Sequence, residues 1–298
     1  MVKPFLKWVG GKTQILPKIM SKIPLKFNNY HEIFVGGGSI LLAILTAIND
    51  GSIKLKGEIY AYDINIALIY TYINIQKKID KVCEYIKLYM TKYDTIIGDE
   101  VNRKPSTIEE ALTSKESYYY WLRHKFNSHD KQSCKVSALF IILNKLCFRG
   151  LYREGPNGFN VPFGHYKTTP TISESNLREV SSLIKDVHFK CIGFEDSIST
   201  TIKGDFMYLD PPYIPLNKTS FTGYNVDGFD HEQHKKLFKM IISASNRGVK
   251  FLLSNSNTDY IKNKFKVFSI EELECRRAIN SKDPSSTATE VLISKPCN

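Results

Sequence analysis

The sequence lacks the patterns of metal-binding, disulfide-stabilised and membrane-spanning proteins. Its six cysteines form no Cys-x-x-Cys pair and are not interleaved with histidines. We therefore expect no metal site and no disulfide framework, and reduced, mostly buried thiols are typical of a cytoplasmic protein. No apolar run reaches the roughly 18 residues that a membrane-spanning helix requires. No signal peptide is expected, because Lys3 and Lys7 are followed by Gly10-Gly11-Lys12 and not by an apolar run.

Two nucleotide-binding motifs are present only in part. Gly10-Gly11-Lys12-Thr13 is similar to the end of a P-loop, but that motif requires a glycine where Leu6 stands. Leu41 likewise occupies the third glycine position of the dinucleotide-binding motif that would begin at Gly36. The sequence therefore does not favour ATP binding by the first segment, and it does not favour a nicotinamide oxidoreductase.

Acidic residues are fewer than basic residues. The 298-residue chain has 41 Lys and Arg against 30 Asp and Glu, which gives a net charge of +11. This excess favours a polyanionic partner, of which the phosphate backbone of nucleic acid is the commonest. The length allows one large α/β domain with an insertion, or two domains.

Near the N-terminus, a strand, a glycine turn and a helix follow one another. Tyr30–Val35 has a strand pattern, Gly36-Gly37-Gly38 forms the turn, and a helix is predicted through Ile48. A second strand ends at Asp63, where an acid can accept hydrogen bonds from both hydroxyls of a ribose, as in nucleotide-binding βαβ units. Asp63 could instead cap a helix predicted over 64–75, and the two roles are compatible.

The middle of the chain is predicted to be helical and basic and to end in a β-hairpin. From about Gln76 to Ser137 the pattern is helical, and we expect Trp121 to belong to the core. A Pro-Asn-Gly turn then predicts a hairpin over about 147–165, with Arg149 and Arg153 on one face. A two-stranded ribbon can enter the DNA major groove, where arginine binds guanine through two hydrogen bonds. An ordinary surface hairpin is the alternative.

A short stretch in the second half of the chain has the strongest chemical pattern. Phe206–Leu209 predicts a buried strand, and Asp210-Pro211-Pro212-Tyr213 follows it directly. The two prolines end the strand, because neither can donate a backbone hydrogen bond. We therefore expect a rigid turn at the carboxyl edge of a sheet, where open α/β sheets bind their ligands. A structural Asx-Pro turn is the alternative.

This turn offers the groups that an exocyclic amine requires to become a nucleophile. The lone pair of an amine such as adenine N6 is delocalised into the ring, so the nitrogen attacks poorly. Two acceptors on its hydrogens, from Asp210 and the Pro211 carbonyl, would favour a pyramidal nitrogen, and Tyr213 can stack on the base. Positioning of this kind contributes about 7–11 kcal/mol in favourable cases.

Taken together, the motifs resemble those of the Dam-type (D12 class) DNA adenine-N6 methyltransferases. The resemblance covers nearly the whole chain in the family's order, and only 76–135 matches weakly. The matching segments are Lys7-Trp8-Val9-Gly10-Gly11-Lys12, Phe34-Val35-Gly36-Gly37-Gly38-Ser39, Asp63, Leu151-Tyr152-Arg153, Phe159-Asn160-Val161-Pro162-Phe163-Gly164, Asp210-Pro211-Pro212-Tyr213, Phe221-Thr222, Tyr224 and Arg276-Arg277.

The resemblance implies an α/β fold and a division of the chain. The fold is a Rossmann-like, seven-stranded sheet of the S-adenosylmethionine-dependent methyltransferases, with a helical and β-hairpin insertion. Residues 1–75 and 175–298 would form the catalytic domain that binds S-adenosylmethionine. Residues 76–174 would form the target-recognition domain that binds DNA.

The resemblance also implies residue roles. The catalytic residues would be Asp210, Pro211, Pro212 and Tyr213. The S-adenosylmethionine pocket would comprise Trp8, Lys12, Phe34, Gly36, Gly38, Ser39, Asp63, Ile64, Phe194 and Asp210, with Ile64 and Phe194 on either side of the cofactor's adenine. The DNA contacts would come from Phe148, Arg149, Leu151, Arg153, Asn160 and Pro162. Phe148 and Arg149 would enter the base stack beside a flipped adenine, and Leu151, Arg153 and Pro162 would read bases.

Two departures concern DNA binding. Arg149 stands where better-known members often have asparagine, and the hairpin turn is one residue shorter than in some. The segment 279–287 lacks the arginine that is often found there.

The sequence therefore predicts an S-adenosylmethionine-dependent enzyme that flips an adenine out of double-stranded DNA and methylates N6. Arg153 suits guanine, and Leu151 and Pro162 suit a thymine methyl group, so GATC or a related short site is the leading target. N4-cytosine methylation uses the same chemistry but more often has serine in place of Asp210. A non-catalytic DNA-binding module would not require the Asp210 turn. The oligomeric state and the biological role, in restriction protection, a virus or regulation, stay open.

Overall fold

The computed structural model describes residues 2–214, 229–276 and 287–295, and it divides into two compact units. The sheet unit comprises Lys12–Val35, Ser39–Asp63 and Asp186–Asn298. The helical unit comprises Met1–Gly11, Gly36–Gly38 and Ile64–Lys185. Each unit is therefore built from segments that are distant in the sequence.

The sheet unit contains a seven-stranded sheet, and this confirms the predicted α/β fold. Its strand order is β10-β11-β9-β8-β2-β4-β7. Strand β11 is antiparallel to β9 and β10, and the other neighbouring pairs are parallel. The strands are β2 (Tyr30–Glu32), β4 (Ile59–Asp63), β7 (Val187–Cys191), β8 (Phe206–Leu209), β9 (Lys250–Ser256), β10 (Ser269–Arg276) and β11 (Thr287–Ser294). A small parallel pair, β1 (Lys26–Phe27) and β3 (Lys54–Leu55), lies outside this sheet.

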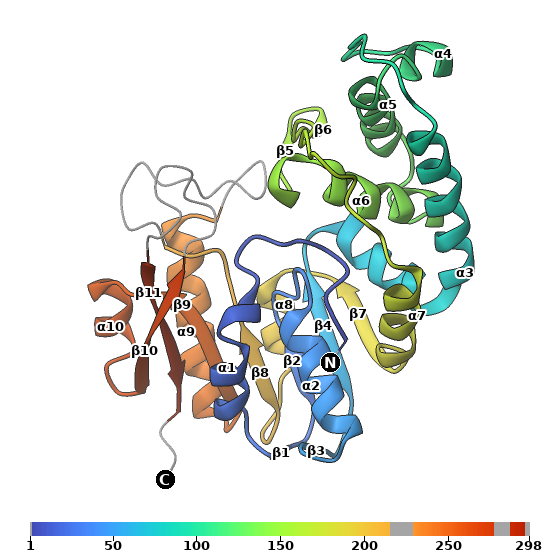
Figure 1. The fold of residues 1–298 in the computed structure, drawn as a ribbon. Coiled ribbons are helices and arrows are strands. Elements are labelled where there is room, and N and C mark those ends of the chain that lie inside the picture. Colours follow the sequence, from blue (N-terminus) through green and yellow to red (C-terminus); the bar gives the residue numbers. More distant parts are fainter. Residues whose placement is uncertain (1, 215–228, 277–286, 296–298) are drawn as a thin grey trace. The chain divides into compact units, whose positions relative to one another are not determined.

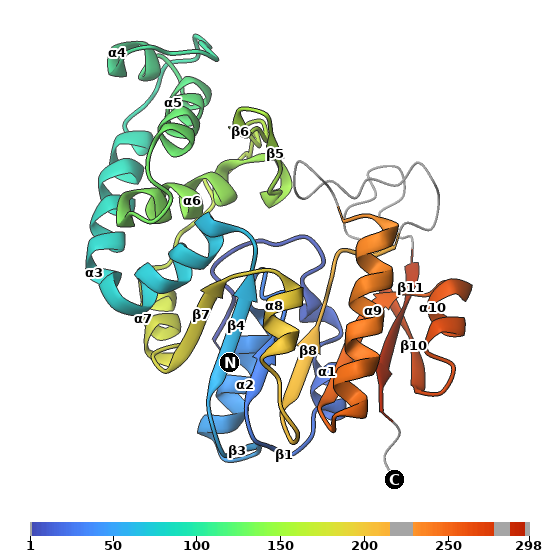
Figure 2. The same ribbon diagram turned by 180° about the vertical axis from the view of Figure 1, so that it is seen from behind.

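Helices cover both faces of the sheet. Helices α1 (Leu16–Lys22) and α2 (Ser39–Asn49) lie on one face, and α8 (Phe194–Ser199) and α9 (His231–Asn246) lie on the other (Figures 1 and 2). Helix α10 (Asp259–Lys264) lies beside α9, and the Phe238 and Phe265 rings are 5.1 Å apart there. Both faces of the central strands are thus shielded from water.

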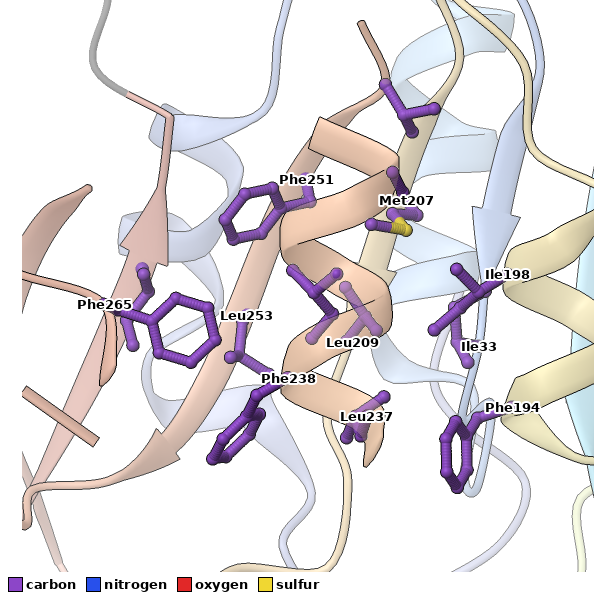
Figure 3. Close-up of a cluster of buried hydrophobic side chains, with 14 of the residues drawn as sticks. Ile33, Phe194, Ile198, Met207, Leu209, Leu237, Phe238, Phe251, Leu253 and Phe265 are labelled. Carbon is purple, nitrogen blue, oxygen red and sulfur yellow. The ribbon is translucent and has the colours of Figure 1, made fainter. Parts of the chain in front are cut away.

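The core between the sheet and α9 explains why β8 has an uninterrupted apolar sequence. Met207 and Leu209 are fully buried beside Leu237 and Phe238 of α9 (Figure 3). Because side chains alternate between the faces of a strand, Phe206 points to the opposite, α2-covered face, where it is also buried. A strand that is buried on both faces requires apolar residues at every position.

Most predicted elements are present, and the differences lie at their ends. Strand β8 has the predicted bounds. Strand β2 ends earlier than predicted, because the Ile33 N–H donates to Tyr208 O of β8 whereas the Val35 N–H donates to Tyr62 O of β4. The chain there passes from one neighbouring strand to the other and leaves the regular ladder.

The helical unit is organised around a long, kinked helix. Helix α3 (Ile66–Asp94) has a non-helical residue at Lys78 and packs on α6 (Cys134–Leu146) and α7 (Glu174–Leu183). Asn74 donates to the Ser137 hydroxyl at 2.9 Å, so the first half of α3 is tied to α6. The remaining helices are α4 (Ile108–Ala111) and α5 (Lys115–Ser128). None of the helices in the described ranges is long and apolar enough to cross a membrane.

Candidate active site

The Asp210 turn leaves the sheet at the point where the strand order reverses. Strand β8 lies between β2 and β9, and the chain continues from β2 to β4 on one side and from β8 to β9 on the other. The carboxyl ends of β2 and β8 are therefore adjacent while their connections diverge. Open α/β sheets bind ligands at such switch points. Phe34 follows the end of β2 and Asp210 follows the end of β8, so two predicted site residues lie at this switch point.

Asp210 forms an ion pair with a buried lysine. Lys12 Nζ lies 2.8 Å from Asp210 Oδ2, and the side chains of Lys12 and Asp210 are 4% and 20% exposed. Lys12 begins a 3-10 turn, η1 (Lys12–Gln14). Burial raises the pKa of Asp210, whereas the Lys12 charge opposes this rise. The ion pair therefore favours the ionised carboxylate, which accepts hydrogen bonds and donates none.

Tyr213 is held by a residue that the sequence analysis did not select. Its hydroxyl donates to Glu290 Oε2 at 2.8 Å, and Lys12 Nζ lies 4.9 Å from the centre of its ring. Burial and the Asp210 and Glu290 charges raise the pKa of Tyr213, so the hydroxyl keeps its proton. In the sequence, the signal of Glu290 is an acidic residue at the start of an apolar strand.

A second residue outside the sequence prediction, His234 of α9, contacts the backbone of the turn. Its Nε2 lies 2.9 Å from the Pro212 carbonyl oxygen, and its Nδ1 lies 2.8 Å from that of Asp230. The Ser256 hydroxyl of β9 donates to the Ile214 carbonyl at 2.9 Å. The turn is therefore fixed from a helix and from a neighbouring strand, in addition to the rigidity of its prolines.

Other predicted cofactor residues of the sheet unit lie at the ends of elements. Ser39 is the first residue of α2, and Phe194 is the first residue of α8. The Phe34 and Phe194 rings are 6.2 Å apart, and both contact Phe229. Phe34 is half-buried and Phe194 is buried, so Phe34 is the more accessible of the two rings.

Asp63 is the last residue of β4, as expected for an acid at a strand tip. It does not cap the following helix. The cap of α3 is Asn65, whose Oδ1 accepts a hydrogen bond from the Leu68 N–H at 3.0 Å. The alternative role of Asp63 as a helix cap is therefore wrong.

Two aromatic residues of the helical unit pack against the glycine turn, and one of them is the predicted cofactor residue Trp8. A Cβ atom on Gly36 would lie 2.8 Å from the Trp8 ring, and one on Gly38 would lie 2.5 Å from the Tyr72 hydroxyl. That hydroxyl donates to the Gly36 carbonyl at 3.0 Å. A larger residue at either glycine would therefore displace an aromatic side chain. Ile64 is 55% exposed, which is unusual for a large apolar side chain.

The predicted hairpin is present, but its paired strands are short. Strands β5 (Glu154–Gly155) and β6 (Gly158–Phe159) pair, and an isolated bridge joins Cys147 to Phe163. A 3-10 turn, η2 (Phe148–Gly150), replaces the first part of the predicted strand. Arg149 in this turn has a φ of +57°, a conformation that a regular strand does not contain.

The predicted DNA-binding residues are mostly accessible. Phe148 is 44% exposed, Arg149, Arg153 and Pro162 are exposed, and Leu151 and Asn160 are half-buried. The Phe148 N–H donates to the Pro162 carbonyl at 2.9 Å, which joins the two arms of the hairpin. Arg153 Nε donates to Asn160 Oδ1 at 2.6 Å across the same hairpin. Asn160 therefore orients the Arg153 side chain.

Helix α5 anchors the returning arm of the hairpin through three side chains that the sequence analysis did not select. Tyr119 and Arg123 both donate to the Val161 carbonyl, at 2.8 and 3.2 Å. Asn127 accepts from the Phe159 N–H at 2.9 Å and donates to the Phe159 carbonyl at 3.0 Å. The three residues are four positions apart and therefore share one face of the helix.

The core prediction for Trp121 is only partly confirmed. Trp121 is half-buried, its ring is stacked on that of Tyr118 at 5.5 Å, and Lys125 Nζ lies 4.2 Å from its centre. Tyr118 and Tyr119 are fully buried. The aromatic run of α5 thus supplies both core residues and hairpin contacts.

Two expectations from the sequence concern metals and thiols. Within the described ranges, no group of three or more His, Cys, Asp or Glu is placed to hold a metal ion. Among the cysteines that the structure describes, Cys83 and Cys147 are buried, Cys134 is intermediate and Cys191 is exposed, so the expectation of mostly buried thiols is only partly confirmed.

Some motif residues named in the sequence analysis lie outside the described residues. They are Phe221, Thr222, Tyr224, Arg277, the segment 279–286 and the side chain of Arg276.

Comparisons with known proteins point to one family. The family model described as "D12 class N6 adenine-specific DNA methyltransferase" matches residues 8–279. The Type II methyltransferase M.MjaIII of Methanocaldococcus jannaschii is 38% identical over 291 residues, which cover 94% of each chain. The Type II methyltransferase M1.LlaDCHI of Lactococcus lactis subsp. cremoris is 29% identical and covers 98% of this chain and 95% of its own. A DNA adenine methylase of Haemophilus influenzae is 29% identical, with 98% and 92% covered.

The ion pair of Asp210 leads to a first prediction. Lys12→Met should raise the pKa of Asp210, because it removes the cation that stabilises the carboxylate. An NMR titration of ¹³C-labelled aspartate carboxyls measures this pKa. Lys22→Met is the matched control, since it removes a lysine from an ion pair with Glu271 in which both side chains are about 40% exposed. An Asp210 pKa that is the same in Lys12→Met and Lys22→Met would contradict the proposed electrostatic role of Lys12.

Proposed function

The chain belongs to the D12 class of N6 adenine-specific DNA methyltransferases, and we propose that its Asp210 turn binds and activates the target amine. The observation that carries this proposal is the 2.8 Å ion pair between buried Lys12 and half-buried Asp210 at the switch point of the sheet. Lys12 contacts Oδ2, so Asp210 can accept one N6 hydrogen through its other oxygen. The Pro211 carbonyl accepts the second hydrogen, and the Tyr213 ring stacks on the base.

These residues act by positioning and by charge. Two acceptors on the N6 hydrogens leave the nitrogen lone pair directed away from the protein groups and toward the methyl donor. As N6 forms its new bond to carbon it gains positive charge, which the Asp210 carboxylate stabilises more in the transition state than in the ground state. The extra proton of the methylated amine then leaves along its hydrogen bond toward Asp210 or to water.

The proposed methyl donor is S-adenosylmethionine, which supplies an electrophilic methyl group when it is bound. Two residues of the sheet unit fit this molecule. Asp63 offers a carboxylate for the two ribose hydroxyls, and the half-buried Phe34 ring offers an apolar surface for its purine. Trp8, Gly36, Gly38, Ser39, Ile64 and Phe194 complete the proposed binding set, as the family resemblance implies.

The proposed DNA interface is the hairpin on the segment 76–174, for which we propose a target-recognition role. Its accessible arginines and the net charge of +11 favour a polyanionic partner. Arg153 suits the O6 and N7 atoms of guanine, and Leu151 and Pro162 suit a thymine methyl group, so we propose GATC or a related short site. Phe148 and Arg149 would fill the space of the flipped adenine. A DNA substrate favours the cytoplasm as the site of action.

The cofactor proposal is tested at Asp63. Asp63→Ala should weaken S-adenosylmethionine binding by about 1.5–3 kcal/mol for each ribose hydrogen bond lost, because each is made to a charged acceptor. Isothermal titration calorimetry measures the cofactor affinity, and DNA affinity without cofactor should stay unchanged. Asp50→Ala, in the turn after α2, is a matched control that should bind the cofactor normally. Equal cofactor affinity in both variants would refute the assignment.

The amine clamp is tested at Asp210. Asp210→Ala should slow single-turnover methyl transfer by ~100-fold or more, by analogy with the loss of one preorganised hydrogen-bonding group at a developing charge. The affinities for DNA and cofactor should change only a few-fold, since the clamp acts mainly in the transition state. Methyl transfer within a few-fold of wild type would remove Asp210 from the catalytic residues.

Base reading is tested at Arg153. Arg153→Ala should cost about 1–3 kcal/mol at the cognate site and should relax discrimination at the guanine, whereas a lost phosphate contact would weaken all sequences alike. Methylation of duplexes substituted at each base of the site measures the difference. Arg103→Ala, an exposed arginine of the same unit that pairs with Glu116, is the control. A uniform loss across all duplexes would show that Arg153 contacts phosphate only.

A further inference from the structure

Four side chains of the sheet unit form one connected polar group. Lys12 pairs with Asp210 at 2.8 Å, and its ammonium lies 4.9 Å from the centre of the Tyr213 ring. The Tyr213 hydroxyl donates to Glu290 Oε2 at 2.8 Å. Lys12, Asp210 and Tyr213 have proposed roles, but Glu290 has none. It lies on β11, a strand that neither the glycine motif nor the Asp210 motif includes.

The Tyr213 hydroxyl has a single proton, and in the structure it donates a hydrogen bond to Glu290. Burial and the negative charges of Asp210 and Glu290 raise the pKa of Tyr213, so the hydroxyl stays a donor. The hydrogen bond to Glu290 and the Lys12 ammonium, 4.9 Å from the ring centre, together hold the ring that we propose to stack on the adenine.

We propose that Glu290 is a positioning residue for methyl transfer. It accepts a hydrogen bond from the Tyr213 hydroxyl and so fixes the ring that stacks on the flipped adenine. This inference rests on the proposed clamp and extends it to a residue on a different strand.

The fold suits Glu290 to this role. Strand β11 pairs with β9 and β10 on its two sides, and Glu290 lies opposite Ser256 of β9. Val291 and Ile293, which follow Glu290, are fully buried in the core below α9. The Glu290 backbone is therefore held between two strands. Its carboxylate is an acceptor only, and a hydrogen bond to an ionised acceptor is stronger than one to a neutral group.

The test is a double-mutant experiment on the single-turnover rate of methyl transfer. Glu290→Leu removes the acceptor and should slow transfer by about tenfold, the effect of one net hydrogen bond. Glu290→Gln keeps an amide oxygen as acceptor and should stay close to wild type. Tyr213→Phe removes the donor of the same hydrogen bond but keeps the stacking ring, so it should slow transfer to a similar extent.

The decisive variant combines Glu290→Leu with Tyr213→Phe. Because both substitutions remove the same hydrogen bond, the double variant should be no slower than Tyr213→Phe alone. If Glu290 acts only by stabilising its strand, Glu290→Leu slows the Tyr213→Phe enzyme as much as it slows the wild type, since that effect does not depend on the Tyr213 hydroxyl. Urea unfolding and cofactor binding establish that each variant is folded, and Glu290→Thr replaces Glu290→Leu if leucine prevents folding.

Matched controls separate the possible results. Glu271 lies on the neighbouring strand β10 and pairs with Lys22. Glu271→Leu removes this carboxylate and should leave the rate of methyl transfer unchanged. A wild-type rate for Glu290→Leu, or a double variant in which the two rate losses multiply, would overturn the role of Glu290. Failure of the clamp is a different result, namely a near wild-type rate for Asp210→Ala.

Discussion

The ion pair between Lys12 and Asp210 is the interaction on which the proposed active site depends. A carboxylate at the end of a buried strand loses hydration, and burial alone would favour its neutral form. Lys12 opposes this effect from a turn near the start of the chain, so the ion pair favours the charged form that an amine clamp requires. Removing Asp210 would take this carboxylate away from a lysine side chain that is only 4% exposed, and an uncompensated buried charge is destabilising. The Tyr213 ring beside Lys12 and the Glu290 carboxylate beyond it extend this polar group across the end of the sheet.

The helical unit holds a short hairpin in a fixed conformation. Two residues in each strand provide too few backbone hydrogen bonds to hold a hairpin on their own. Tyr119, Arg123 and Asn127 supply the missing contacts from one face of α5. The bond from Arg153 to Asn160 then limits the rotamers of the proposed base-reading arginine. Rigidity of this kind lowers the entropy that the arginine loses on binding.

The sequence predicted the parts of the structure that depend on local pattern. The apolar run of β8, the prolines after Asp210 and the acid at the end of β4 all follow from neighbouring residues, and all were found where they were expected. Arg149 was expected in a strand, but its positive φ interrupts that strand, and residue type alone does not predict a positive φ in arginine. Asp63 was one candidate helix cap, but Asn65 makes the capping bond instead.

Contacts between distant residues could not be predicted in the same way. Glu290 is 77 positions from Tyr213, and Asn127 is 32 positions from Phe159. Such contacts depend on strand order and on helix packing, and neither can be read directly from a single sequence. His234 is an extreme case, because a histidine within an amphipathic helix gives no sign that its ring contacts a proline carbonyl.

The most direct test of the account is a crystal structure of the enzyme with a duplex that contains its target site and an unreactive analogue of S-adenosylmethionine. The account predicts that the flipped adenine lies against the Tyr213 ring. Its N6 should lie about 2.7–3.2 Å from both an Asp210 oxygen and the Pro211 carbonyl, while Lys12 stays paired with Asp210 Oδ2. An adenine whose N6 contacts neither group, or an Asp210 carboxylate bonded to the Tyr213 hydroxyl in place of the base, would contradict it.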